Sequence, residues 1–526
     1  MVFAAFSFRE DYWETFELDD SDIEFLYSHL LDVETPLPSE DLAVVLIEER
    51  IRREVQRMEQ QQAEVGDIYL PKETYEPETQ LVFPAMGGRI GTVIEKRQGW
   101  NPNYDDFEVI KVRFDDGEEK EFAAGFEDHA LNEASDLEPD LPAVDDVLAA
   151  HGDLLIERLE AGLFAKPDFV RIAFKWFPRA LLMDFNAGYL NLAEAVLDMA
   201  GGGPLPTADL LEPMEFSVDE TPKLVEFSLD LALQEDPRFD EVGPAGEILW
   251  YLKRLEPDGI LEVPLPLQYT PIDYDRSQLT PAMLDLERLL DDELSPLEPV
   301  DHPADEISIP LLYPHWRAGT LPLSPRVQPF FPTAYEAPRI RFILVDGLTN
   351  EKFPGWVVRE QSYVFGLEEW YRQRELMPGS IISIRPGDTV GEVVVSVNEQ
   401  RSHPDWVRTV LVGTDGGIVF ANLKQLVTAS YDERRVIAVP DMAMLDKVWE
   451  RQRENGHPPF ERTVVNMVRE LTKLSMQGHM HAAELYAAVN LVRRCPPGPI
   501  LSLLASRPWF EHIGDLYFRL SDVEIK

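Results

Sequence analysis

The sequence predicts a multi-domain α+β protein. Its 526 residues exceed what one hydrophobic core supports, because domains usually hold about 100 to 200 residues. A hydrophobic content of 44% excludes a wholly disordered chain. Segments with the period of a helix alternate with segments with the period of a strand, so we expect several modules of mixed class.

The N-terminal module, residues 1–65, is predicted to be a helical hairpin. Leu26 and Leu30 recur at helical spacing, and Ser39 stands where it can cap a second helix. Residues 66–132 change to the period of a strand, with Val-, Ile- and Phe-rich segments between turns. This pattern predicts a small SH3-like β-barrel, which an acidic linker follows.

Two regions share one order of elements. Residues 144–255 are predicted to hold a helical block and then a first copy of a repeated unit, and residues 441–526 a second copy. In each copy a helix, a short turn and two further helices lead into an aromatic- and Gly-containing hairpin. The first copy runs through Gly203-Pro204-Leu205-Pro206-Thr207 and Arg238-Phe239-Asp240-Glu241-Val242-Gly243; the second runs through Gly478-His479-Met480-His481 and Trp509-Phe510-Glu511-His512-Ile513-Gly514. Three helices closed by such a hairpin predict a winged helix in each copy.

The remaining part of the chain is predicted to be a connector and a β domain. Residues 256–338 are rich in Pro and acidic residues, which is typical of an extended connector. Residues 339–440 return to the period of a strand around one short helix, which predicts a β-barrel or pseudobarrel. This layout resembles the pseudobarrel DNA-binding domains of plant transcription factors and some restriction enzymes.

The repeated unit resembles the HARE-type winged helix. The resemblance rests on His479-Met480-His481-Ala482-Ala483-Glu484-Leu485 with Pro508 to Leu520, and on Gly203 to Leu210 with Arg238 to Gly243. The family includes the N-terminal domain of the delta subunit of bacterial RNA polymerase and eukaryotic chromatin-associated modules. The resemblance covers under a quarter of the chain and implies an association with transcription. This chain departs from the delta subunit because it has two copies and carries its acidic residues within folded modules.

Charge is distributed unevenly along the chain. Residues 339–526 hold 23 Lys and Arg against 24 Asp and Glu, so the first 338 residues carry 25 against 72, a net charge of -47 out of -48. Only the C-terminal third can approach a polyanion without strong repulsion. We predict that backbone-directed nucleic-acid contact is made there by seven cations: Arg493, Arg494, Arg507, Arg519, Arg462, Arg469 and Lys473. The third helix of the first copy, near Lys223 to Asp236, carries Glu226, Asp230, Glu235 and Asp236, which would repel a phosphate backbone, so it is expected to contact protein or to pack against the duplicated domain.

No catalytic motif is present. We find no nucleophile elbow, no phosphate-binding loop and no metalloprotease helix, so we expect no catalytic residue and no cofactor. His479, His481 and Cys495 do not match the spacing of a zinc site, and Asp346, Glu351 and Lys352 are the nearest approach to a nuclease set. The single cysteine excludes an intramolecular disulfide. No apolar run is long enough to cross a bilayer, and no signal peptide opens the chain, so we expect a soluble, cytoplasmic protein.

Three functions follow as hypotheses. The first is a non-enzymatic nucleic-acid-associated protein, such as a transcription accessory factor, whose C-terminal third contacts DNA or an RNA polymerase-type complex and whose acidic N-terminal part contacts basic protein surfaces. The second is a protein-interaction scaffold without direct nucleic-acid binding. The third is an enzyme linked to restriction or DNA modification.

Overall fold

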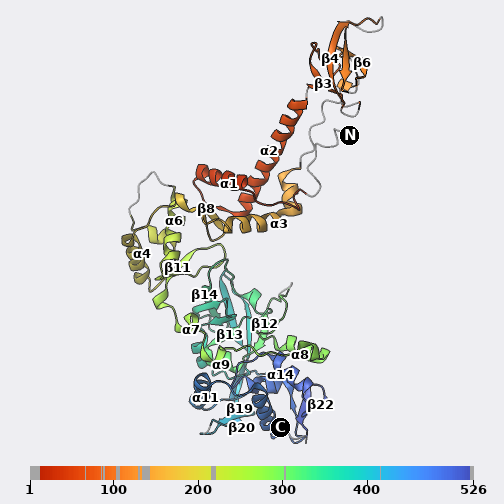
Figure 1. The fold of residues 1–526 in the computed structure, drawn as a ribbon. Helices are drawn as coiled ribbons and strands as arrows, with labels where there is room; N and C mark the ends of the chain where they lie inside the picture. Colours follow the sequence, from red (N-terminus) through yellow and green to blue (C-terminus); the bar gives the residue numbers. More distant parts are fainter. Residues whose placement is uncertain are drawn as a thin grey trace. The chain divides into compact units, whose positions relative to one another are not determined.

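The computed structural model describes residues 12–65, 67–83, 86, 89–101, 107–115, 117–127, 129, 131–132, 142–214, 221–300, 304–414 and 416–521. The predicted mixed α+β class is confirmed, with helices and several separate sheets. The chain forms two compact units (Figure 1). Unit 1 is Met1–Met183 with Asp219–Phe227, and unit 2 is Asp184–Val218 with Ser228–Lys526.

In unit 1, segments far apart in sequence form one three-helix arrangement, which we name the N-terminal copy. Its elements are α1 (Asp20–Val33), β1 (Leu37–Pro38), α2 (Ser39–Val65), α3 (Val144–Phe164), β7 (Phe169–Ile172) and β8 (Lys175–Pro178), and its sheet has the order β1-β8-β7. The 3-10 helix η3 (Arg179–Leu181) follows. The two helices predicted for residues 1–65 are present as α1 and α2. The helical block after residue 144 supplies α3, which packs on α2 and completes this arrangement.

A five-stranded sheet is inserted between α2 and α3 in the sequence. It consists of β2 (Asp67–Ile68), β3 (Gln80–Phe83), β4 (Arg89–Gln98), β5 (Glu108–Phe114) and β6 (Glu119–Ala124), in that order across the sheet. Its core is aromatic, since the rings of Tyr69, Phe83 and Phe122 lie within 5.3 Å of one another. The strands predicted within 66–132 are present.

Unit 2 contains two more copies of the three-helix arrangement. The middle copy has α4 (Ala187–Met199), β9 (Leu205–Pro206), α5 (Thr207–Leu211), α6 (Pro222–Glu235), β10 (Phe239–Glu241) and β11 (Leu249–Leu252). The C-terminal copy has α12 (Phe460–Thr472), β21 (Met480–His481), α13 (Ala482–Val489), α14 (Pro497–Ser506), β22 (Phe510–Gly514) and β23 (Tyr517–Leu520). The division between the two units falls within α6.

The three copies share one strand register. The short strand before the second helix pairs through Leu37 with Trp176, through Leu205 with Trp250, and through Met480 with Phe518. Each of these three aromatic residues stands two positions before the residue that pairs with the first Phe of the hairpin. The sequence contains the same relation as Leu-Pro-Ser/Thr-x-Asp-Leu at 37–42 and 205–210. A third copy, missed at the sequence level, is therefore present in unit 1.

The largest sheet has seven strands and includes two strands from the predicted connector. Its order is β12 (Ile307–Pro310), β17 (Ile381–Pro386), β18 (Glu392–Val397), β14 (Arg339–Asp346), β15 (Lys352–Val358), β16 (Tyr363–Phe365) and β13 (Thr320–Pro322), antiparallel except between β14 and β18. Both outermost strands come from residues 256–338. The prediction that this segment is only a connector is wrong, and so is the boundary at 339.

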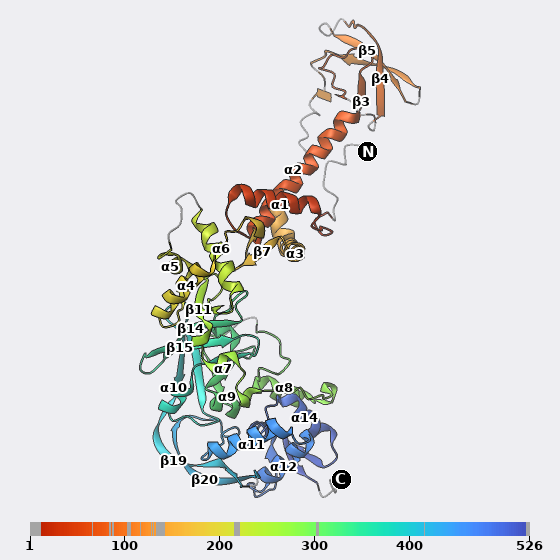
Figure 2. The same cartoon turned by 60° about the vertical axis from the view of Figure 1, so that its left-hand side comes forward.

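Short helices and one hairpin complete unit 2. The helices are α7 (Asp258–Leu261), α8 (Pro281–Leu290), α9 (Tyr313–Ala318), α10 (Glu368–Gln373), α11 (Met442–Asn455), η4 (Lys253–Leu255), η5 (Leu265–Leu267), η6 (Arg276–Gln278) and η7 (Gln328–Phe330). The hairpin pairs β19 (Glu399–Val412) with β20 (Ile418–Ala429) as a separate two-stranded sheet that runs beside α11 and α12 (Figure 2). One apolar core joins this hairpin to the C-terminal copy and α8 through Leu286, Val410, Phe420, Leu485 and Leu501.

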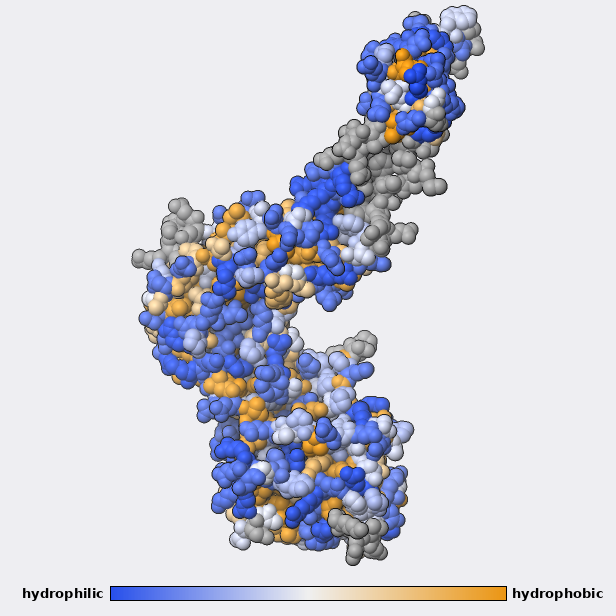
Figure 3. All heavy atoms as spheres, in the orientation of Figure 1, coloured by the Kyte–Doolittle hydropathy of each residue, from blue (hydrophilic) through white to orange (hydrophobic). Residues whose placement is uncertain are grey.

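The surface is mainly polar. On the face shown in Figure 3, hydrophilic side chains predominate and hydrophobic ones lie in small patches. Among the described residues, no helix combines the length and apolar character that crossing a membrane requires.

Candidate functional site at the C-terminal copy

Arg494 lies at the centre of a buried charge cluster. Only 1% of its surface is exposed. Its Nη1 and Nη2 each donate to Asp292 at 2.8 Å, and Nη2 also donates to Glu293 at 2.6 Å. Both carboxylates belong to the predicted connector. The prediction that Arg494 contacts nucleic acid is therefore wrong, because its guanidinium is buried and both Nη1 and Nη2 are hydrogen-bonded within the protein.

The cluster extends to the helices on either side. Glu293 contacts Nε2 of buried His315 at 3.0 Å, and the Tyr486 hydroxyl donates to Asp292. Burial alone would raise the pKa of Glu293, but Arg494 and His315 reverse this effect and hold it well below the usual value. The Asp292 carboxylate raises the pKa of Arg494 against the opposing effect of burial. This cluster (Asp292, Glu293, His315, Tyr486 and Arg494) fixes the segment after α8 to the C-terminal copy.

Four other predicted cations are already engaged on the protein surface. Arg507 pairs with Glu461 at 3.3 Å, Arg519 with Glu511 at 2.8 Å and Lys473 with Glu470 at 2.6 Å. Arg493 is half-buried, donates to the carbonyl of Pro458 at 3.1 Å and lies over the Phe460 ring. Such exposed pairs contribute little to stability, but they reduce the positive charge available to a polyanion.

The remaining two cations lie together on α12. Arg462 and Arg469 are exposed and seven positions apart, so they share one face of the helix with Asn466. Arg469 donates to the amide oxygen of Asn466 at 3.2 Å. Arg462 and Arg469 are therefore accessible to a ligand, as the predicted nucleic-acid contact required of all seven cations.

The third helix of the C-terminal copy is covered by the protein itself. Residues of α14 from Pro497 to Ser502 are buried, and α14 packs on α8 and on η6 (Figures 1 and 2). The Ser502 hydroxyl donates to the carbonyl of Asp275, and a side chain on Gly498 would overlap the Tyr274 hydroxyl. Ser502 is therefore not presented to a ligand, whereas Ser506 at the end of α14 is exposed.

The acidic residues of α6 in the middle copy have two different environments. Asp230 is buried and accepts hydrogen bonds from Thr207 and from the indole of Trp250, the latter at 2.9 Å. Asp236 pairs with Arg238 at 2.7 Å. Neither of these two carboxylates is therefore free to contact an outside partner.

In unit 1, α3 exposes an acidic face. Asp146, Asp153 and Glu157 are exposed and follow one another at intervals of seven and four positions, on one side of the helix. None of the three forms an ion pair within the described residues. This face (Asp146, Asp153 and Glu157) presents unneutralised negative charge.

A second acidic cluster lies between the middle copy and the large sheet, within unit 2. Arg339 donates to Asp240 at 2.9 Å and lies 3.4 Å from Glu256. Burial, followed by the charge of Asp240, raises the pKa of Glu256 to about 8. Burial, followed by the charge of Glu336, raises the pKa of Glu241 to about 8 as well. These carboxyls make the packing of the middle copy sensitive to pH.

The histidines and the cysteine have structural surroundings. His481 caps α13 by accepting from the backbone N–H of Ala483, and burial lowers its pKa to about 4. Cys495 is buried. In the part of the chain that the structure describes, no group of three His, Cys, Asp or Glu side chains could hold a metal ion.

The residues nearest to a nuclease set are not assembled as one. Asp346 is buried, ion-paired with Arg374 and bonded to the indole of Trp370 at 2.9 Å. Lys352 pairs instead with Glu392. The carboxylate and the lysine that such chemistry needs are thus each engaged elsewhere.

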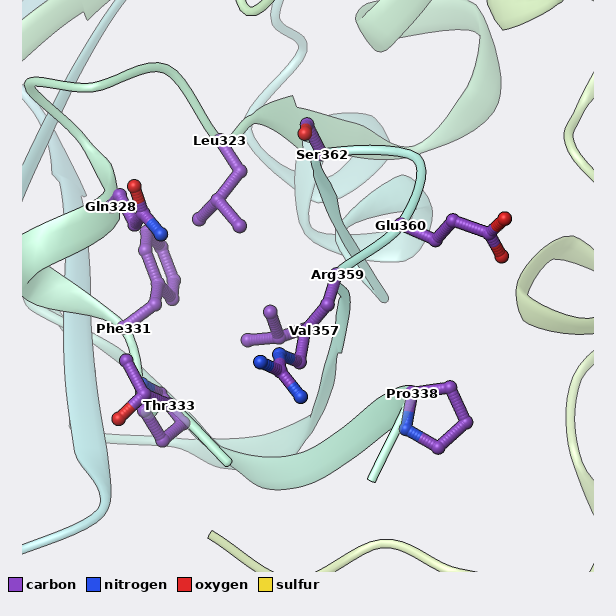
Figure 4. Close-up of a pocket in the computed structure, with 10 residues that line it drawn as sticks. Leu323, Gln328, Phe331, Thr333, Pro338, Val357, Arg359, Glu360 and Ser362 are labelled. Carbon is purple, nitrogen blue, oxygen red and sulfur yellow. The ribbon is translucent and has the colours of Figure 1, made fainter. Parts of the chain in front are cut away.

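One cavity in unit 2 measures about 450 Å³ and is open to solvent. Leu323, Phe331 and Val357 line it, with Arg359 at its centre (Figure 4). Arg359 donates to the carbonyl of Ala337 at 3.0 Å, and Glu360 points away from the cavity.

Comparison with protein-family models, with curated proteins and with solved structures found no match to this chain.

Proposed function

We propose that this chain is a non-enzymatic protein-interaction scaffold, built from three winged-helix copies of the HARE type. The shared element order and strand register of the three copies support the winged-helix assignment. The acidic charge of the first 338 residues supports partners with basic surfaces.

The covered state of α14 carries this proposal. In three-helix DNA-binding folds the third helix enters the major groove. In the C-terminal copy that helix packs on α8 and η6 instead, so its surface contacts protein from the same chain. A winged helix used in this way acts as a protein-docking surface.

The exposed third helix in unit 1 supports the same function with an outside partner. The α3 face presents Asp146, Asp153 and Glu157, which repel a phosphate backbone and attract Lys or Arg side chains. Surface charges of this kind mainly accelerate association and select the partner.

The test is titration of the full chain with a fluorescein-labelled lysine-rich peptide, followed by anisotropy at two salt concentrations. The variant Asp146→Asn/Asp153→Asn/Glu157→Gln is expected to bind more weakly than the wild type. A matched control, Glu262→Gln/Glu360→Gln/Asp388→Asn, removes equal charge from exposed positions of unit 2. Equal losses in both variants would contradict a role for the α3 face.

Nucleic-acid association is a second candidate, favoured by one observation. Arg462 and Arg469 remain exposed on α12 and could contact a phosphate backbone, as expected of a transcription accessory factor. Titration of the full chain with duplex DNA at low salt tests this candidate against Arg462→Ala/Arg469→Ala. The titration uses the full chain and not residues 339–526 alone, because that fragment would lack β12, β13 and the carboxylate partners of Arg494.

A further inference from the structure

The β19–β20 hairpin has one covered edge and one free edge. Ala438 covers the β19 edge, since its N–H donates to the carbonyl of Arg408 at 2.8 Å and its carbonyl accepts from Val410 at 3.0 Å. No described element pairs with the outer edge of β20. Between Asn422 and Leu426 this edge is exposed on both faces of the hairpin.

The register shows which backbone groups are free. Because Arg408 and Val410 direct their N–H and C=O groups away from β20, they and their partners Asn422 and Phe420 are the non-hydrogen-bonded pairs. By alternation, Lys424 and Leu426 also direct their backbone groups outward. Within the described residues these groups have no hydrogen-bond partner.

The edge has little of the usual protection against strand addition. Natural edge strands are commonly shielded by charged side chains, especially lysine, by proline or by a covering element. Lys424 is the only charged residue from Ile418 to Ala429, and Leu423 and Leu426 are exposed. An unprotected edge of this kind accepts an extended polypeptide.

The side chains beside the edge define the chemistry of the occupant. Trp406 is 64% exposed and faces Lys424, whose Nζ lies 5.5 Å from the ring centroid. Among the residues that the structure describes, Lys424 has no carboxylate partner, whereas the hairpin's Glu399 pairs with Arg374 and its Asp405 accepts from Tyr431. An uncompensated cation therefore lies between two exposed leucines.

We propose that the β20 edge at Asn422 to Leu426 binds an extended acidic peptide by strand addition. In antiparallel addition the peptide order is apolar beside Leu426, polar, acidic beside Lys424, apolar beside Leu423, and polar beside Asn422. A polypeptide matches this edge better than a nucleic acid does, because the outward carbonyls need donors and repel phosphates. The inference is independent of the scaffold function, since it concerns a different surface.

The test uses the full chain and a fluorescein-labelled peptide with Leu-Thr-Glu-Val-Thr at its centre. Saturable binding by anisotropy is expected. Lys424→Glu should weaken it by roughly fivefold and favour a peptide with lysine in place of glutamate, since opposite charges across a strand pair attract. The matched control Lys447→Glu, an exposed lysine on α11, should leave binding unchanged.

Backbone pairing is tested separately from charge. A peptide N-methylated at the glutamate loses the donor to the Lys424 carbonyl and should bind about fivefold more weakly. Asn422→Pro removes one outward N–H at a position where an edge strand tolerates proline, while Asn422→Ala keeps that N–H and should bind like the wild type.

Several outcomes overturn the proposal. They are equal losses for Lys424→Glu and Lys447→Glu, wild-type affinity for the N-methylated peptide, and absence of binding. If a single-stranded oligonucleotide binds, and Lys424→Glu abolishes this binding but Asn422→Pro does not, the edge would be assigned to nucleic acid. Self-association abolished by Asn422→Pro, without peptide binding, would assign it to a second copy.

Discussion

Replacing Arg494 by methionine tests whether the buried cluster is structural. Arg494 and Asp292 are fully buried, and the change removes three charge-assisted hydrogen bonds while leaving two carboxylates in a low-dielectric site. Breaking a buried pair from one side costs about 3–5 kcal/mol. At ~2–4 °C per kcal/mol for larger domains, we expect the melting temperature of unit 2 to fall by at least roughly 6 °C.

The assay is calorimetry of the full chain, with hydrogen exchange to locate the loss. Protection should fall at residues 286–296 and 486–495, on the two sides of the cluster. Arg462→Met, at an exposed position, is the control and should change stability by less than about 0.5 kcal/mol. Adding Asp292→Asn and Glu293→Gln to Arg494→Met should recover part of the loss. If Arg494→Met lowers the free energy of unfolding by less than about 1 kcal/mol, the cluster is not structural and the reasoning is refuted.

Three further predictions concern other parts of the chain. Glu256 has a pKa of about 8 in the folded state, whereas in the unfolded state it releases its proton near pH 4.5. The free energy of unfolding should therefore fall as pH rises between these two values. Glu256→Gln should flatten this pH dependence, as measured by urea titrations. Gly498→Leu should displace Tyr274 and cost about 1–3 kcal/mol, detectable as faster proteolysis near 272–290. Ser39→Ala should leave the buried Trp176 N–H, now 3.0 Å from the serine hydroxyl, without an acceptor and cost unit 1 about 1–3 kcal/mol by thermal melting.

Periodicity predicted individual elements well because it is a local property. The helix expected before the short turn of the second copy corresponds to α12 at Phe460–Thr472, and the helix expected after that turn corresponds to α13 at Ala482–Val489. The turn of the expected hairpin lies just after Gly514, since Asp515 and Leu516 take positive φ. Boundaries shift in this way because packing and capping select among neighbouring positions.

Assembly was less predictable, since it depends on contacts between distant segments. The five-stranded insertion separates α2 from α3, which hid the N-terminal copy, although the Leu-Pro-Ser/Thr-x-Asp-Leu repeat carried the signal. The connector was misjudged because proline content indicates breaks in helices but does not exclude edge strands such as β12 and β13. Charge counting could not separate Arg494 from Arg462, because a count contains no information on burial.

The three copies differ in what their third helices meet, although their strand register is the same. In the N-terminal and middle copies a hydroxyl at the start of the second helix bonds to the hairpin tryptophan, as Ser39 does with Trp176 and Thr207 with Trp250. The same hydroxyl donates to a carboxylate of the third helix, Ser39 to Glu160 and Thr207 to Asp230. The inner face of the third helix is therefore fixed by this network, and only its outer face is free to vary in sequence. Acidic residues on α3 and small apolar residues on α14 are thus both compatible with the arrangement. We therefore expect substitutions on the outer face of the third helix to set what each copy binds, because that face can change without disturbing the core.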